Sequence, residues 1–192
     1  MTCGLINNLP GIENKSFLEL GYKNGRNFEL IQCREKMSVD INGQADFNGT
    51  TDEFFESVSP FQMWDIIFVD ACHDYDFVLR DFNRSLAHAR EWVILHDMIP
   101  PTEKHIEKRF CSDAYKILYR LITETDLQIY PMKGRMGLTF VRVPRYPVAR
   151  IMYELETIPS DLTFQQFQTF IRRIKLYNDN EIVKNLNFER RV

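Results

Sequence analysis

Short apolar runs alternate with amphipathic stretches along most of the chain. Four of these runs predict buried strands, and each ends at a glycine or a polar residue: Ser16–Leu20, Lys36–Val39, Trp64–Val69 and Glu91–Leu95. Apolar side chains at helical spacing predict four helices: Gly25 to about Cys33, Thr51–Val58 with Thr51 as its cap, Asp76–Arg90 and Ala114–Thr123. This alternation predicts a parallel sheet covered by helices on both faces.

The C-terminal third of the chain follows a different pattern. Leu127–Tyr130 and Gly137–Val143 have no helix between them, so we expect an antiparallel hairpin at the edge of the sheet. Pro144, Pro147 and Pro159 then interrupt regular structure. Thr163–Leu176 carries one apolar helical stripe, made of Phe164, Phe167, Phe170, Ile171 and Ile174. By default this stripe packs on its own domain; the alternatives are a homodimer contact or a lid.

Composition and charge exclude several classes of protein. With 192 residues, 44% of them hydrophobic, and no long linker, the chain is expected to form one domain, with a core over 15–143 and a helical extension over 144–192. No apolar run is long enough for a membrane span, and the N-terminus lacks the pattern of a secretory signal. The four cysteines show no paired spacing, which indicates reduced thiols and a cytoplasmic protein.

The two parts of the chain differ in charge. Residues 1–130 carry a net charge of −8 and residues 131–192 one of +5. A basic segment can attract a phosphorylated or nucleic-acid substrate, but solvated faces of ordinary helices explain it more simply. Aromatic and basic residues do not interleave densely, so the sequence argues against a nucleic-acid-binding platform.

Carboxylates stand at the ends of four predicted strands, namely Glu19, Asp40, Asp70 and Asp97. Because an open parallel sheet binds its ligands outside the carboxyl ends of its strands, these residues predict a binding site. A dinucleotide fold would need Gly-x-Gly-x-x-Gly after the first strand, and here Lys23 occupies the place of the middle glycine. The first loop therefore disfavours a nicotinamide-dependent dehydrogenase, while Asp40 suits the two ribose hydroxyls of an adenosine group.

Taken in order, FLELGYKNGRNF, SVD, TTDEFF, WDIIFVDACHDYDFVLRDF and WVILHDMIPPTEKH resemble the class I S-adenosylmethionine-dependent methyltransferases. The likeness is greatest to their small-molecule and sugar O-methyltransferases and covers about residues 15–143. It implies a Rossmann-like, doubly wound, seven-stranded, mostly parallel sheet of order 3-2-1-4-5-7-6 with an antiparallel last strand. It also implies S-adenosylmethionine (SAM) as cofactor and a small-molecule acceptor.

The resemblance also assigns residues to the cofactor. Glu19, Gly21 and Gly25 would line its methionine and sulfonium part, and Asp40 would hold the ribose hydroxyls. Two further sets are implied, Thr51 and Asp52 near the adenine edge and Asp70 below the methionine moiety. Relatives usually carry helices before the first strand that cover the cofactor. About fifteen residues precede it here, which implies a more open pocket or one covered by the C-terminal segment or a second subunit.

We expect His73, His96 and Asp97 to be the catalytic residues. In metal-dependent relatives a divalent ion binds acids after the fourth and fifth strands, which implies Asp70, His96 and Asp97 as ligands of Mg²⁺ or Mn²⁺ here, with Met98 where a third ligand often stands. Alternatively His73 or His96 acts as a general base toward the acceptor. A different class of function stays open: a protein that keeps the cofactor fold as a binding or assembly module, which Lys23 favours.

Overall fold

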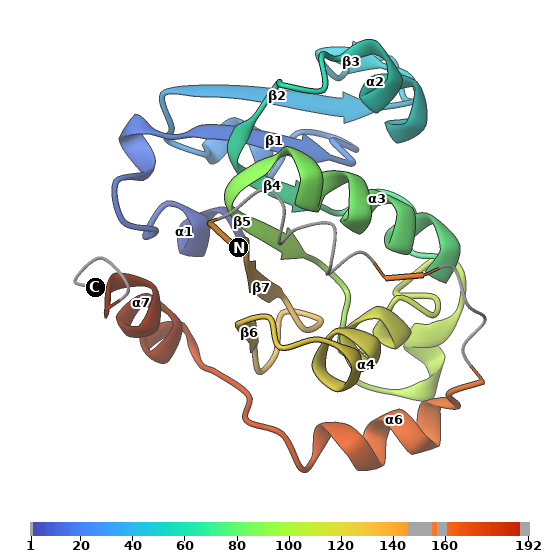
Figure 1. Cartoon of the computed structure of the whole chain (residues 1–192). Coiled ribbons are helices and arrows are strands. Elements are labelled where there is room, and N and C mark those ends of the chain that lie inside the picture. Colours follow the sequence, from blue (N-terminus) through green and yellow to red (C-terminus); the bar gives the residue numbers. More distant parts are fainter. Residues whose placement is uncertain (1, 146–154, 157–160, 189–192) are drawn as a thin grey trace.

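The computed structural model describes residues 2–145, 155–156 and 161–188 and contains one seven-stranded sheet (Figure 1). Its order is β3-β2-β1-β4-β5-β7-β6, with β5 and β7 paired antiparallel, so the expected topology is confirmed. The strands are β1 (Ser16–Leu20), β2 (Glu35–Asp40), β3 (Phe47–Asn48), β4 (Trp64–Val69), β5 (Ala89–Leu95), β6 (Ile129–Pro131) and β7 (Thr139–Arg142). The two-residue strand β3 has too few residues to produce a readable pattern in the sequence.

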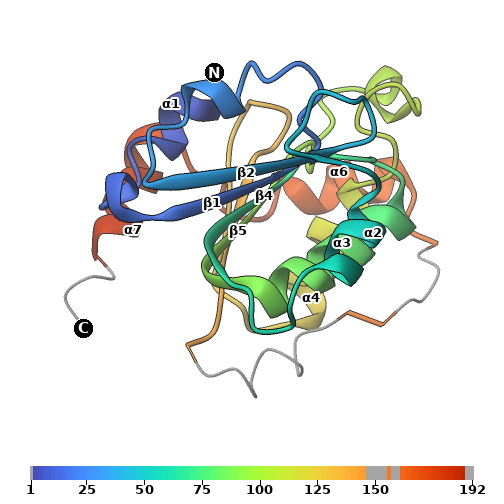
Figure 2. The same cartoon turned by 90° about the horizontal axis from the view of Figure 1, so that it is seen from above.

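Helices cover both faces of the sheet, as Figure 2 shows. One face carries α2 (Thr51–Ser57), α3 (Tyr75–His88), α4 (Tyr115–Glu124) and α6 (Phe164–Ile171), whose apolar side chains form the larger core with the strands. The other face carries α1 (Thr2–Ile6), α7 (Asp179–Phe188) and the 3-10 turns Ile12–Asn14 and Phe28–Leu30, which form a second core. Most helix and strand bounds agree with the expected ones to within two residues.

The helix expected from Gly25 to about Cys33 is wrong, since a single 3-10 turn forms there. Lys36 on β2 explains the difference. Its Nζ donates to the carbonyls of Phe28, Glu29 and Ile31, at 2.8, 3.1 and 3.4 Å. These carbonyls would accept backbone hydrogen bonds if the helix continued, so the lysine replaces the helix with a compact turn.

The cap of α2 also differs from the expectation. Thr50, one residue before Thr51, accepts a hydrogen bond from the backbone of Glu53, and Glu53 bonds back to complete a capping box. The hydroxyl of Thr51 is thereby free to turn inward, where it donates to Asp81 on α3.

Two members of the predicted apolar stripe, Phe164 and Phe167, are buried within the chain, and Phe170, Ile171 and Ile174 are half-buried. Phe164 and Phe167 pack on Tyr115 of α4, with ring centroids 5.7 and 4.9 Å apart, and Phe170 packs on Tyr119. Helix α6 ends at Ile171, so Ile174 lies in the extended segment that follows. Of the expected proline breaks, Pro147 and Pro159 lie outside the described residues.

The extended segment after α6 covers the edge of the sheet. Tyr177 forms a parallel bridge with Met132, donating to the carbonyl of Pro131 and accepting from Lys133. An edge strand with unpaired backbone groups invites pairing with another chain, and this segment blocks that. In the part of the chain that the structure describes, no helix has both the length and the apolar character to cross a bilayer.

We expect Phe167→Ala to lower the free energy of unfolding by about 3–5 kcal/mol, because Phe167 is fully buried between α4 and α6. Thr169→Ala, at an exposed position of the same helix, is the matched control and should change it by less than about 0.5 kcal/mol. Urea denaturation followed by circular dichroism measures both. Equal effects of the two variants would show that α6 is not anchored by its apolar stripe.

Candidate functional site

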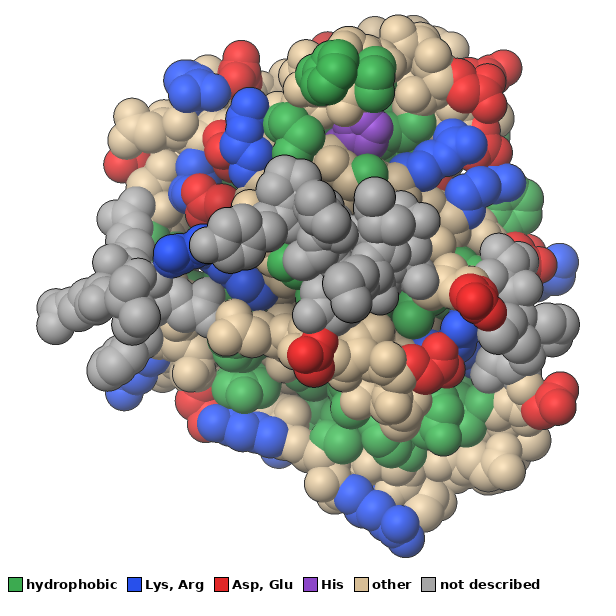
Figure 3. Space-filling view, in the orientation of Figure 1, with side chains coloured by type: hydrophobic (Ala, Val, Ile, Leu, Met, Phe, Trp, Pro, Cys, Tyr) green, Lys and Arg blue, Asp and Glu red, His purple; other side chains and the backbone are tan. Residues whose placement is uncertain are grey.

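A cavity of about 750 Å³ opens at the carboxyl edge of the parallel strands. In Figure 3, which has the orientation of Figure 1, a histidine is visible at the surface among hydrophobic and basic side chains near α2 and α3. One end of the cavity is lined from β2, α2 and α3 by Asp40, Ile41, Thr51, Asp52, Phe77 and Asp81. The other end is lined from the ends of β4 and β5 by Asp70, His73, His96 and Asp97, with Gly21 and Lys23 between the two ends.

Gly21 brings the ends of β1 and β4 together. It has φ +98°, and a Cβ built there would lie 2.1 Å from the carbonyl oxygen of Asp70. No side chain can occupy that space, because the neighbour is backbone and cannot move aside. The turn after β1 therefore presents bare backbone to the cavity, while Lys23, at φ +55°, adopts the left-handed conformation that a glycine would take more easily.

Asp40 is held in place by the same turn. One carboxylate oxygen accepts from the backbone N–H of Lys23 at 2.6 Å, and the other accepts from that of Asn42 at 3.0 Å. The Asn42 side chain in turn donates to the carbonyl of Lys23. Each carboxylate oxygen keeps a second lone pair that can accept from a ligand hydroxyl.

Glu19 and Gly25, which the resemblance assigns to the cofactor, do not line the cavity. Glu19 is buried on β1 behind the turn and accepts from the side chain of Asn27 at 3.0 Å. Burial raises the pKa of Glu19 to about 8, so the carboxyl is largely neutral at pH 7. Gly25 closes the turn against the ring of Tyr22, where a Cβ would come within 2.4 Å of the hydroxyl oxygen.

Ion pairs and hydrogen bonds lock the α2 end of the cavity to α3. Arg80 Nε and Arg84 Nη1 each lie 2.9 Å from a carboxylate oxygen of Asp52. The hydroxyl of Thr51 donates to Asp81 at 2.6 Å. The residues expected near an adenine edge are thus braced by three side chains of α3, including Asp81, for which the sequence pattern offered no signal beyond a polar position on an amphipathic helix.

At the other end, two histidines bridge two carboxylates. His73 Nε2 lies 3.2 Å from Asp70 Oδ1 and 3.3 Å from Asp97 Oδ2. His96 Nδ1 lies 3.2 Å from Asp70 Oδ1 and 3.1 Å from Asp97 Oδ1. The structure therefore brings together Asp70, His73, His96 and Asp97. The sequence predicted all four to lie at the strand ends and to take part in catalysis or metal binding.

The charges of this cluster stabilise one another. Burial alone would lower the pKa of His96, but the carboxylates of Asp70 and Asp97 outweigh it and raise that pKa to about 10. For Asp70, burial works against ionisation, but hydrogen bonds and charges from His73 and His96 lower the pKa to about 2. His73 Nδ1 faces the carbonyl of Phe110, which can only accept, so this nitrogen carries a proton as well. The cluster thus favours the imidazolium form of His96, and the charges of the same two carboxylates raise the pKa of His73 above its usual value.

Asp97 adopts a strained backbone conformation at φ +61°. For a non-glycine residue this costs of the order of 1–3 kcal/mol and persists only where neighbours enforce it. Here His96 donates its backbone N–H to Val69, and Ile99 donates to Met136 across the turn. The strain aims the Asp97 carboxylate at the cluster instead of away from it.

The segment between β5 and α4 supplies residues that sequence analysis missed. The thiol of Cys111 lies beside Asp97, and burial together with the charge of Asp97 raises its pKa to about 12. Ser112 donates to Asp74 at 2.6 Å, and Asp113 accepts from the backbone of Tyr75 at 2.7 Å. These contacts hold the segment against the start of α3, beside His73. Their partners are nearly forty residues apart in sequence, so no local pattern reveals them.

The geometry tests which residues fit a metal ion. One ligand atom each from Asp70, His96 and Asp97 lies within 4.8 Å of the others. Among the described residues, His96 Nδ1 is a buried nitrogen without a well-aligned hydrogen bond, although both carboxylates are near it. Two carboxylates and one imidazole suit Mn²⁺ and are acceptable to Mg²⁺. Met98 is 1% exposed within the core and takes no part.

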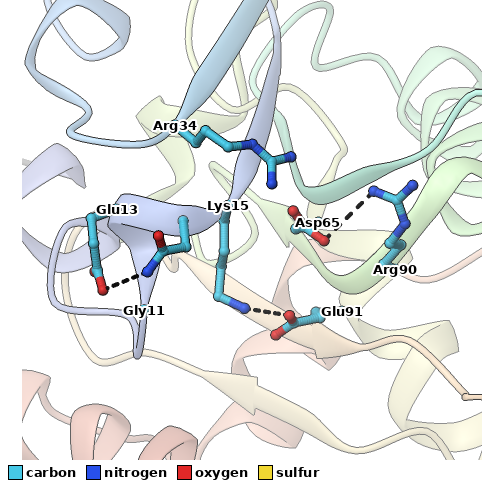
Figure 4. A pocket seen from close by; sticks show the side chains of 8 residues that line it. Gly11, Glu13, Lys15, Arg34, Asp65, Arg90 and Glu91 are labelled. Carbon is cyan, nitrogen blue, oxygen red and sulfur yellow. Dashed lines mark hydrogen bonds and ion pairs between the residues drawn. The ribbon is translucent and has the colours of Figure 1, made fainter.

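A second cavity, of about 610 Å³, lies at the opposite, amino edge of the strands (Figure 4). Four of its charged side chains pair with one another: Lys15 with Glu91, and Arg90 with Asp65 at 3.7 Å. Asp65 also accepts from the backbone and hydroxyl of Ser16. These pairs fix the starts of β1, β4 and β5, and their balanced charge points to no particular ligand.

Solved structures, methyltransferases among them, share the fold. Cofactor-bound Rv0187 from MTB matches with a TM-score of 0.56 at 14% identity, over 75% of this chain and 78% of that one. The O-methyltransferase TomG from Streptomyces achromogenes, in complex with SAM, matches with a TM-score of 0.51 at 12% identity, over 74% and 79%. The SAH-bound methyltransferase PaMTH1 from Podospora anserina matches with a TM-score of 0.50 at 14% identity, over 68% and 72%.

No family model and no curated protein sequence matches the chain. At these identities the structural likeness establishes the Rossmann-like fold of class I methyltransferases, which the strand order also shows.

We expect Gly21→Ala to destabilise the fold by about 2–4 kcal/mol, because the new methyl group would press on the backbone of Asp70 and the positive φ would be strained. Gly4→Ala is the control, since nothing lies within 4 Å of the added methyl group. Thermal melting of both variants measures the difference. A Gly21→Ala protein that melts like the wild type would contradict the close approach of β1 and β4.

Proposed function

We propose that this protein is a SAM-dependent O-methyltransferase that acts on a small molecule or a sugar. The observation that carries the proposal is a single cavity within this fold, with the carboxylate of Asp40 at one end and the Asp70–His96–Asp97 cluster at the other. The O-methyltransferase TomG, solved with SAM, has a similar fold and supports the same cofactor.

The residues of the first turn suit the cofactor's shape. Asp40 can accept hydrogen bonds from both ribose hydroxyls while it keeps its two backbone donors. Gly21 lets the ends of β1 and β4 close on each other beside the place of the methionine part. Asp70 then borders the sulfonium, whose positive charge a carboxylate stabilises. Glu19 supports this turn from behind through Asn27.

Methyl transfer forms a bond from the acceptor oxygen to the methyl carbon as the carbon–sulfur bond breaks, and the hydroxyl proton must leave. The leaving sulfide needs no acid, so the protein contributes alignment and a more electron-rich oxygen. A divalent ion held by Asp70, His96 and Asp97 would lower the pKa of an acceptor hydroxyl bound beside it. Asp97 would set the position of the acceptor through its fixed, strained backbone.

The general-base alternative is less well supported by the charges of the site. His96, whose pKa the carboxylates of Asp70 and Asp97 raise to about 10, already carries its proton at neutral pH and cannot accept another. A metal ion in the cluster would be held by Asp70, His96 and Asp97, and it would take the place of the proton on His96 Nδ1. We therefore favour the metal-dependent mechanism, with His73 at the rim of the site.

We expect wild-type protein to bind SAM or S-adenosylhomocysteine (SAH) with micromolar affinity, about 8 kcal/mol, in isothermal titration calorimetry. Asp40→Ala should weaken binding roughly 100-fold, about 3 kcal/mol, because two charge-assisted hydrogen bonds to ribose are lost. Asn42→Ala loosens the same loop without removing the carboxylate, and it should retain most of the affinity. Binding of NAD in place of either adenosyl compound would refute the proposal.

We expect Asp97→Ala to abolish turnover, on an acceptor found by screening sugars, phenols and nucleotides, while SAH affinity stays within about threefold of wild type. A chelator should stop the reaction and Mn²⁺ should restore it, and calorimetry with Mn²⁺ alone should show a site in the wild type that Asp97→Ala lacks. Asp126→Ala, at an exposed position, is the control. Full activity of Asp97→Ala would exclude both mechanisms, and cofactor binding without turnover on any acceptor would favour a binding or assembly module.

A further inference from the structure

Asp81 is a buried carboxyl group in the wall of the cavity. It is 1% exposed, and its Oδ1 accepts from the hydroxyl of Thr51 at 2.6 Å. Among the described residues, Thr51 is the one hydrogen-bond donor to this side chain, so Oδ2 has no donor from the protein. A carboxylate can accept about four hydrogen bonds, and a buried one normally fills most of that capacity.

The neighbours of Asp81 do not offset the free-energy cost of burying its carboxylate. Burial raises the pKa of Asp81 to about 6, so the carboxylate is mainly ionised at neutral pH although it is buried. The two nearby guanidinium groups, on Arg80 and Arg84, make their close contacts with Asp52 and not with Asp81. An asparagine would accept from Thr51 equally well without a buried charge. A residue that is costly to the fold and not needed for its local contacts is typical of a binding site.

The same end of the cavity carries two exposed apolar side chains. Ile41, directly after Asp40, is 77% exposed, and Phe77 in the first turn of α3 is 45% exposed. Apolar groups left open beside a carboxylate acceptor fit a flat aromatic ring that has an amino group on its edge. Asp40 lies next to them, so this ring belongs to a ligand whose ribose is bound by Asp40.

We infer that Asp81 selects the nucleobase of the cofactor, by accepting a hydrogen bond at Oδ2 from the exocyclic amino group of adenine while Ile41 and Phe77 border the ring. The inference rests on the proposed function, because it takes the adenosyl group to be the ligand of Asp40. An ionised carboxylate has no hydrogen to donate. It therefore accepts a 6-amino purine and repels a 6-oxo purine, whose edge presents a carbonyl oxygen.

The test compares two ligands that differ at this one position, SAH and S-inosylhomocysteine. Calorimetry on the full chain should show that wild type prefers SAH by on the order of 100-fold. In Asp81→Asn the amide can donate to a 6-oxo group, so the preference should fall below about tenfold, through weaker SAH binding and stronger binding of the inosyl compound. Glu56→Gln, an exposed acid on α2, is the matched control and should keep the wild-type preference.

Thermal melting separates this role from a structural one. Asp81→Asn retains the bond to Thr51 and removes a buried charge, so its melting temperature should equal or exceed that of wild type. An unchanged ligand preference in a folded Asp81→Asn protein would overturn the inference and leave the methyltransferase proposal intact. Wild type that binds neither ligand would overturn both, and an Asp81→Asn protein that melts much earlier would assign Asp81 to the fold instead.

Discussion

The close approach of β1 and β4 at Gly21 is the constraint on which the site depends. The backbone of Asp70 lies where a side chain on residue 21 would have to be, so the two strand ends meet without a gap. Asp70 donates its backbone N–H to Leu20, and Gly21 donates to Val39 on β2. These bonds place the ends of β1, β2 and β4 at one edge, and the carboxylates that follow β2 and β4 therefore open into one cavity.

Charge is distributed very differently at the two edges of the sheet. At the amino edge, Lys15, Arg90, Asp65 and Glu91 neutralise one another in pairs that join strand to strand. At the carboxyl edge, Asp70 and Asp97 share two histidines, and Asp97 is held in a strained conformation to do so. Ion pairs at the amino edge satisfy the fold alone, whereas the carboxyl edge keeps strain and an under-satisfied nitrogen on His96. Such features persist where binding or catalysis makes use of them.

Short or distant elements cover the face of the sheet opposite α2, α3 and α4. A 3-10 turn, held by Lys36, takes the place of a helix after β1, and the short α1 and the distant α7 complete the cover. Ile182 and Leu186 of α7 join Leu5 and Ile6 of α1 in one core, so the C-terminal segment supplies apolar surface near the N-terminus. Helix α6, in contrast, packs on α4 of the other face. The two helices of the extension thus support opposite faces of the same sheet.

The sequence by itself determined every strand except β3, the helices α2, α3, α4 and α6, and the strand-end residues. Buried runs such as Trp64–Val69 and amphipathic spacing such as that of α4 are local signals, and the parallel order brings Asp40, Asp70 and Asp97 to one edge whatever the details of packing. The tertiary structure decided the features that depend on contacts between residues far apart in the sequence. Lys36 prevents a helix that the local pattern favours, Glu19 turns behind the cavity it was expected to line, and Asp81 enters that cavity through a contact with Thr51 thirty residues away. A side chain's direction and protonation depend on what packs against it, and periodicity in sequence carries no information about such neighbours.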